Sequence, residues 1–164
     1  LVAETLKKLC EKLGIALPAI RMEPGRSIVA DAGITLYTVG AVKTIPGYKN
    51  YVSVDGGMAD NPRYALYRAD YEIVCANKAN EDRNEIVTVA GKCCESGDLI
   101  QEGTKLQSVV PGDILAVLST GAYNYSMASN YNRIPRPPVV MIKDGEARTV
   151  VKRETYEQVS QNDI

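Results

Sequence analysis

From residue 34 onward the chain is a series of short β-prone segments separated by turns, and this pattern constrains its fold more than any other feature. The segments are rich in Val, Ile, Thr and Tyr, and Gly, Pro, Asn or Asp stand between them. Asp144 and Gly145 are typical of a type I′ hairpin turn, because both tolerate positive φ. The expected strands are residues 34–45, 51–54, 71–76, 86–90 and 114–118, with a hairpin over 139–151. We therefore expect a mainly β fold, a Greek-key-like β-barrel or sandwich over residues 27–164 with a short final helix.

The first 26 residues follow an α/β pattern instead. Apolar residues recur at helical spacing from Val2 to Leu13, and Gly14 follows as a helix C-cap. The apolar run 16–22 ends at Glu-Pro-Gly, as a buried strand that meets a loop would. A lone helix–strand half-unit cannot bury both of its faces, so we expect residues 1–26 to be the last helix and strand of a truncated α/β barrel.

Composition limits the partners. A net charge of −1 and a pI near 5.6 provide no basic field for a phosphate backbone, so nucleic acid is not expected. No apolar run approaches the roughly 20 residues that span a bilayer, and no signal-peptide pattern opens the chain, so no membrane partner is expected. These features predict a cytoplasmic protein that acts on a small molecule.

The cysteine and histidine counts exclude two kinds of site. The four cysteines stand at positions 10, 75, 93 and 94 without paired metal-ligand spacing, and the chain has no histidine, so no metal site is expected. Without an imidazole base, neither a Ser-His-Asp nor a Cys-His nucleophile can be built.

The segment Gly91-Lys-Cys-Cys-Glu-Ser-Gly-Asp98 places a thiol beside a carboxylate in a glycine-bounded loop. The Cys94 thiol can return a proton to a carbanion, and Glu95 can hold a substrate ammonium group. Cys93 is expected on the opposite face of a strand-like segment, where it serves only in packing. Taken alone, the segment favours the plainer interpretation of a turn with one buried cysteine and a solvated glutamate.

Two further motifs carry anion-binding residue types. In Glu23-Pro-Gly-Arg26, glycine lets backbone N–H groups approach a phosphate while the arginine reaches an anion, although a surface Pro-Gly turn is the plain alternative. Arg63 and Tyr67 lie four residues apart after Asn61-Pro62, so one helical turn would let them grip one carboxylate. The alternative there is a solvated arginine and a packed tyrosine.

Together with Asp55-Gly-Gly57, Pro62-Arg-Tyr-Ala-Leu-Tyr67 and Gly121-Ala-Tyr-Asn-Tyr-Ser-Met-Ala-Ser-Asn-Tyr-Asn132, these motifs resemble the diaminopimelate decarboxylases from about Leu17 to the end. These are pyridoxal-phosphate enzymes of the group that includes ornithine and arginine decarboxylases. The glutamate after the cysteine favours the diaminopimelate branch, because an aspartate usually follows in the ornithine branch. The resemblance implies the carboxyl-terminal portion of an enzyme that converts meso-2,6-diaminopimelate into L-lysine and CO2.

The resemblance also implies roles for individual residues. Cys94 is the expected proton donor, and its loop is presented across a homodimer interface, so that each site is composite. The expected cofactor-binding residues are Glu23, Pro24, Gly25, Arg26 and Tyr123. The expected substrate-binding residues are Arg26, Arg63, Tyr67, Glu95 and Tyr123, with Arg63 and Tyr67 at the distal carboxylate.

Two family features have no counterpart in this sequence. The family binds its cofactor covalently through a lysine near the start of a (β/α)8 barrel, and a barrel histidine stacks on the cofactor ring. None of the ten lysines matches that setting. We therefore expect the chain to need the preceding barrel and to be inactive alone. Two alternatives stay open: the same portion of an ornithine, arginine or carboxynorspermidine decarboxylase, or a non-catalytic dimerisation module.

Overall fold

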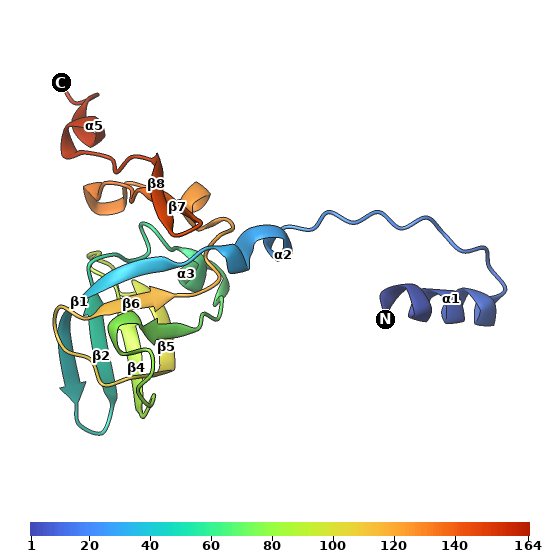
Figure 1. Cartoon of the computed structure of the whole chain (residues 1–164), viewed down its shortest axis with the longest axis horizontal. Coiled ribbons are helices and arrows are strands. Elements are labelled where there is room, and N and C mark those ends of the chain that lie inside the picture. Colours follow the sequence, from blue (N-terminus) through green and yellow to red (C-terminus); the bar gives the residue numbers. More distant parts are fainter.

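A computed structural model describes residues 1–164 and places six of the eight strands in one curved sheet (Figure 1). The strand order is β3-β6-β1-β2-β4-β5, and every pair is antiparallel except β2 and β4. The strands are β1 Thr35–Ile45, β2 Lys49–Val54, β3 Ile73–Cys75, β4 Glu85–Ala90, β5 Leu99–Leu106, β6 Ile114–Val117, β7 Val139–Lys143 and β8 Glu146–Val151. The helices are α1 Val2–Leu13, α2 Arg26–Val29, α3 Arg63–Tyr67, α4 Asn124–Met127 and α5 Tyr156–Ser160, with 3-10 turns at Ala30–Ala32, Ala76–Lys78 and Tyr131–Arg133.

Strand β1 belongs to both halves of the sheet. Its first residues pair with β6, and its later residues pair with β2. The register shifts between Val39 and Ala41, so Gly40 forms a bulge. Bulges bend a strand and increase its twist, and this bend lets one strand cross from one half to the other.

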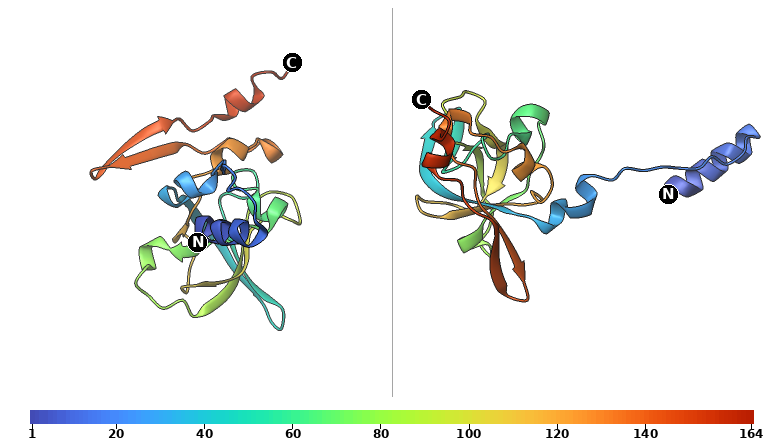
Figure 2. Two further views of the ribbon diagram at one scale, coloured as in Figure 1. Left: turned by 90° about the vertical axis from the view of Figure 1, so that its right-hand side faces the viewer. Right: turned by 90° about the horizontal axis from the view of Figure 1, so that it is seen from above.

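Two buried glutamines join the edge strands. The side-chain oxygen of Gln101 accepts a hydrogen bond from the Tyr71 backbone N–H, and that of Gln107 accepts one from the Cys75 backbone N–H, each at 3.0 Å. These bonds link β5 to the β3 edge, where unpaired N–H groups would otherwise be buried. The sheet therefore curls into a nearly closed barrel (Figure 2). The predicted mainly β barrel is confirmed.

The barrel interior is filled by alternating side chains of its strands, as the period of two along a β-strand requires. β-Branched residues predominate, and Tyr37 and Tyr71 supply the only aromatic rings. The core comprises Tyr37, Val39, Val52, Val54, Tyr71, Ile73, Cys75, Val87, Val89, Ile100, Leu106, Val109, Leu115 and Val117.

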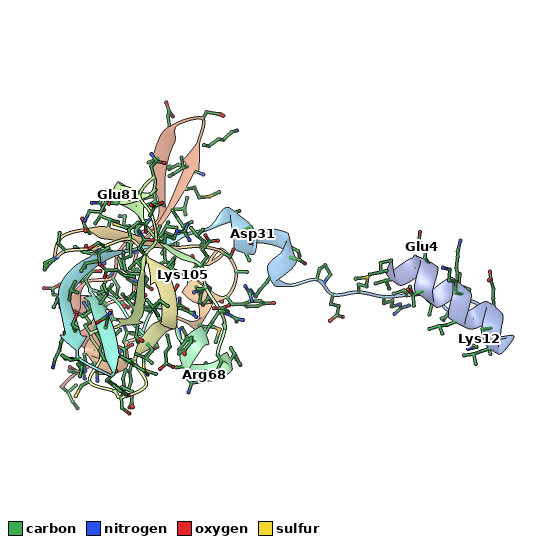
Figure 3. All side chains as sticks on the ribbon, turned by 90° about the horizontal axis from the view of Figure 1, so that it is seen from below. Glu4, Lys12, Asp31, Arg68, Glu81 and Lys105 are labelled. Atoms are coloured by element: carbon green, nitrogen blue, oxygen red, sulfur yellow. The ribbon has the colours of Figure 1, made fainter.

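The amino-terminal residues lie away from the barrel. Helix α1 ends at Gly14, which has a φ of 64°, so the predicted helix and its cap are confirmed. The strand predicted over 16–22 is wrong: these residues form an extended segment between α1 and α2 (Figure 1). A strand needs a hydrogen-bonded neighbour, and none lies beside this segment. Figure 3 shows Glu4 and Lys12 on α1, far from the sheet.

The carboxyl-terminal hairpin and helix also project from the barrel (Figure 1). Asp144 and Gly145 have φ values of 52° and 81°, so the predicted hairpin turn is confirmed. Strand β5 was not predicted from the sequence, because Gly103 and several polar residues interrupt the alternation of apolar and polar residues along it. The predicted short final helix is present as α5 and begins with a capping box of Thr155 and Gln158. The longest helix has 12 residues, and no helix has the length and apolar character needed to cross a bilayer.

Candidate active site

Residues 91–98, between β4 and β5, carry the predicted catalytic thiol, and we call them the thiol loop. The loop is built around the carboxylate of Asp98, which is 4% exposed. Its Oδ1 accepts a hydrogen bond from the Met58 backbone N–H and its Oδ2 one from the Cys93 backbone N–H, both at 2.6 Å. Asp98 therefore ties the thiol loop to the turn after β2.

Two glycines make room for this carboxylate. A Cβ on either Gly57 or Gly91 would overlap the oxygens of Asp98. Both glycines stand in motifs noticed in the sequence, but these motifs belong to different turns and nothing in their spacing shows that they meet. Asp98 was therefore not predicted from the sequence as a site residue.

Cys94 and Glu95 lie exposed on the thiol loop. The backbone N–H of Cys94 donates to Oδ1 of Asn132 at 2.7 Å. The Glu95 carboxylate accepts hydrogen bonds from the hydroxyl groups of Ser96 at 3.1 Å and Tyr131 at 3.3 Å. Hydrogen bonds to the carboxylate, led by the one from Ser96, lower the pKa of Glu95. Its ionised form is therefore favoured, as binding of an ammonium group requires.

Cys93 differs from its neighbour in burial. It is half-buried, whereas Cys94 is exposed. Burial raises the pKa of the Cys93 thiol. The predicted strand-like geometry of this segment is wrong, because the residues form consecutive bends around Asp98. The packing role of Cys93 stays a prediction.

Arg63, Tyr67, Tyr123 and Gly25 form a second group, which we call the arginine cluster. The Cζ atom of Arg63 lies 5.2 Å from the ring centroid of Tyr67 and 5.6 Å from that of Tyr123. Both distances suit cation–π interactions, and the predicted sharing of one helix face by Arg63 and Tyr67 is confirmed. The Nε of Arg63 is buried without a hydrogen-bond partner. Buried unpaired donors are rare, so this donor is a candidate for binding an anion.

Backbone contacts bring the chain near residue 25 against the loop that carries Tyr123. The N–H of Gly121 donates to the Ala30 carbonyl at 2.9 Å. Gly25 then lies so close to Tyr123 that an added Cβ would overlap the phenol oxygen. Tyr123 has a φ of 72°, which is unfavourable for a residue with a side chain.

The side chains of Glu23, Pro24 and Arg26 are exposed. Arg26 takes part in none of the ion pairs of the chain. The predicted roles of Arg26 in substrate binding and of this turn in phosphate binding stay predictions.

One segment, residues 121–133, reaches both groups. At its midpoint, the Met127 sulfur lies 3.9 Å from Nη1 of Arg63. Near its end, Tyr131 and Asn132 make hydrogen bonds to the thiol loop. No hydrogen bond or ion pair joins the thiol loop directly to the arginine cluster. The segment belongs to a motif noted in the sequence, but Tyr131 and Asn132 were not predicted as site residues.

The donors around the arginine cluster suit an anion. They are the guanidinium group of Arg63 and the hydroxyl groups of Tyr67 and Tyr123. Guanidinium groups bind phosphates and carboxylates through paired hydrogen bonds. The donors of the arginine cluster therefore suit an anionic group such as a phosphate or a carboxylate.

Comparison with known proteins gives concordant matches. Residues 26–121 match the family described as "Pyridoxal-dependent decarboxylase, C-terminal sheet domain". Over 99% of its length the chain is 55% identical to diaminopimelate decarboxylase of Bacillus subtilis (strain 168), of which it covers 37%. The chain thus spans about a third of the length of the curated relatives that it matches.

Two solved structures of decarboxylases also match this chain. Diaminopimelate decarboxylase from M. jannaschii in complex with L-lysine is 37% identical, with a TM-score of 0.80 over 96% of this chain and 36% of that one. Lysine/ornithine decarboxylase from Vibrio vulnificus in complex with cadaverine is 25% identical, with a TM-score of 0.58 over 70% of this chain and 31% of that one.

Proposed function

The chain belongs to the pyridoxal-dependent decarboxylase family as its C-terminal sheet domain, and we propose that it is the carboxyl-terminal portion of a diaminopimelate decarboxylase. The complete enzyme would convert meso-2,6-diaminopimelate into L-lysine and CO2, a step of lysine biosynthesis in the cytoplasm. The observation that carries this proposal is the pair of Cys94 and Glu95, exposed together on an anchored loop in a chain that is 55% identical to such an enzyme.

The diaminopimelate branch is supported over the ornithine branch by two comparisons. The match to the diaminopimelate enzyme extends over 96% of the chain, whereas the match to the lysine/ornithine enzyme extends over 70%. Diaminopimelate also differs from lysine by a second carboxylate. Arg63, with its unpaired buried donor, is the group proposed to bind that carboxylate, together with Tyr67.

Cys94 and Glu95 have complementary roles in the proposed reaction. The bond from Cα to the carboxylate carbon breaks, CO2 leaves, and the carbon takes up a proton. Sγ of Cys94 holds the proton that is delivered to this carbon. The ionised Glu95 carboxylate binds the remote ammonium group and so orients the substrate.

The cofactor is proposed to lie near the turn at residues 23–26. Glu23, Pro24, Gly25 and Arg26 would hold its phosphate, and Tyr123, which touches Gly25, would lie beside both cofactor and substrate. When bound, pyridoxal phosphate supplies the electron sink that makes loss of CO2 feasible. We propose that an α/β barrel precedes residue 27 in the complete enzyme and supplies the lysine side chain that binds the cofactor covalently.

The separation of the two groups supports a composite site in a homodimer. The thiol loop of one subunit would face the cofactor and arginine cluster of the partner, since no hydrogen bond or ion pair joins the two groups within this chain. Another basic-amino-acid decarboxylase of the same family is the second candidate, because the fold match extends to the lysine/ornithine enzyme.

The test is CO2 release by the protein that the complete gene encodes, supplied with pyridoxal phosphate and, in parallel, meso-diaminopimelate, lysine, ornithine, arginine or carboxynorspermidine. We expect diaminopimelate to be the preferred substrate and the 164-residue chain alone to release no CO2. Preference for another of these substrates would assign the chain to the decarboxylases that act on that substrate. No CO2 from any of them would favour the non-catalytic dimerisation module, and release by the isolated chain would contradict the composite site.

A further inference from the structure

A buried carboxylate without a cationic partner lies beneath the thiol loop. No lysine or arginine forms an ion pair with Asp98. Its two oxygens instead accept hydrogen bonds from the backbone N–H groups of Met58 and Cys93. Removing a carboxylate from water is unfavourable, and hydrogen bonds to charged groups offset part of that penalty. The two hydrogen bonds fix the backbone at Met58 and Cys93.

The backbone that Asp98 fixes is the one that presents Cys94. Cys93 directly precedes Cys94, and its carbonyl accepts a hydrogen bond from the Glu95 N–H at 2.8 Å. The Glu95 carbonyl in turn accepts one from the Asp98 N–H at 3.1 Å. The loop thus closes on itself, with the Asp98 side chain holding its first half and the Asp98 backbone its second half.

A second contact places the loop relative to the barrel. The N–H of Lys92 donates to the Gly56 carbonyl at 2.9 Å, next to the Met58 N–H that Asp98 binds. The Asp98 carboxylate packs so closely against Gly57 and Gly91 that a Cβ on either glycine would overlap it. The carboxylate is therefore enclosed between the two turns. Any displacement of Asp98 therefore moves the peptide that carries the thiol.

We propose that Asp98 is a positioning residue, which sets the place of the Cys94 thiol and the Glu95 carboxylate relative to the substrate. This inference rests on the proposed decarboxylase function. Asp98 itself touches neither substrate nor cofactor and acts through the backbone of Cys93. Misplacement of a reacting group by about 1 Å can lower a rate by on the order of 10²-fold.

The test uses Asp98→Asn, Gly91→Ala and Gly97→Ala in the complete enzyme. Asparagine has a single carbonyl oxygen and an NH2 group that would face one of the two N–H donors. Alanine at Gly91 pushes the carboxylate aside, whereas Gly97 belongs to the same loop and a Cβ there meets nothing within 4 Å. The readouts are kcat per folded molecule, KM, cofactor absorbance and the alkylation rate of Cys94, measured on its peptide by mass spectrometry.

We expect Asp98→Asn and Gly91→Ala to lower kcat by roughly 10-fold to 10²-fold, with cofactor absorbance unchanged and Cys94 alkylation altered. Gly97→Ala should keep the parental alkylation rate. A folded Asp98→Asn or Gly91→Ala enzyme with parental kcat and alkylation, whatever its melting temperature, would overturn the proposal. Failure of both variants to fold would also overturn it, because Asp98 would then hold the fold rather than the loop. If the parent enzyme releases no CO2, the proposed function fails, while the alkylation rates still decide whether Asp98 positions the thiol.

Discussion

The thiol loop and the arginine cluster carry the two halves of the proposed chemistry, and they are held in opposite ways. The thiol loop is fixed by backbone hydrogen bonds to a buried carboxylate, with every oxygen of Asp98 paired. The arginine cluster is held by side-chain stacking, and it keeps a buried Nε of Arg63 unpaired and two tyrosine rings about half exposed. The contrast suits the proposed roles, which need a preorganised loop for proton delivery and a cluster with a donor left for an anion.

The strongest way to break this comparison is Cys94→Ala in the complete enzyme. Loss of a proton donor should lower kcat by on the order of 10²-fold to 10⁴-fold and leave cofactor absorbance unchanged. Single-turnover kinetics with diaminopimelate measure the effect. Cys93→Ala is the matched control, because it removes the neighbouring thiol, and it should keep most of the turnover. Equal turnover of Cys94→Ala and the parent would remove this thiol from the reaction.

The next test is Arg63→Ala, which removes the cation of the arginine cluster. We expect kcat/KM for diaminopimelate to fall by on the order of 10²-fold, mainly through KM, because a substrate carboxylate would lose its partner. Activity on diaminopimelate, lysine and ornithine should be compared before and after the change. Arg83→Ala removes the same charge from a surface ion pair with Glu72 and should change little. Unchanged diaminopimelate kinetics in Arg63→Ala would contradict the assignment.

A smaller effect should follow from crowding the arginine cluster with Gly25→Ala. The new Cβ would overlap the Tyr123 hydroxyl, so kcat/KM should fall by about tenfold as this ring moves. Tyr123→Phe removes the atom that is hit, so Gly25→Ala should be less harmful in that background. Strictly additive effects in this double-mutant cycle would show that the two residues do not act through their contact.

The smallest expected effect is a pH shift at the thiol loop. Hydrogen bonds led by Ser96 and including Tyr131 lower the pKa of Glu95. Activity that needs the ionised carboxylate is lost as the pH falls through this pKa, so removing a donor should move the acid limb of kcat/KM to higher pH. Ser96→Ala should shift that limb more than Tyr131→Phe. A shift to lower pH in either variant would contradict this role of Glu95.

Part of the site was readable from local sequence. The four-residue spacing of Arg63 and Tyr67 after a proline predicted the helical turn on which they meet, because helix geometry is a local property. The adjacency of Cys94 and Glu95 is covalent and needs no fold. Asp98, Tyr131 and Asn132 were missed, because each acts on a segment that is distant in the sequence.

The sequence by itself determined the elements whose stability is local: helix α1 with its glycine cap, the β7–β8 hairpin with its Asp-Gly turn, and the mainly β character of residues 35–151. Only the tertiary structure decided that residues 16–22 form no strand, that β5 exists, and that two glutamines join the edges of the barrel. Strand pairing, edge closure and the burial of Asp98 depend on hydrogen bonds between segments far apart in the chain. The free energy of those bonds depends on which group is the partner and on how deeply the pair is buried. The local sequence pattern specifies neither the partner nor the burial.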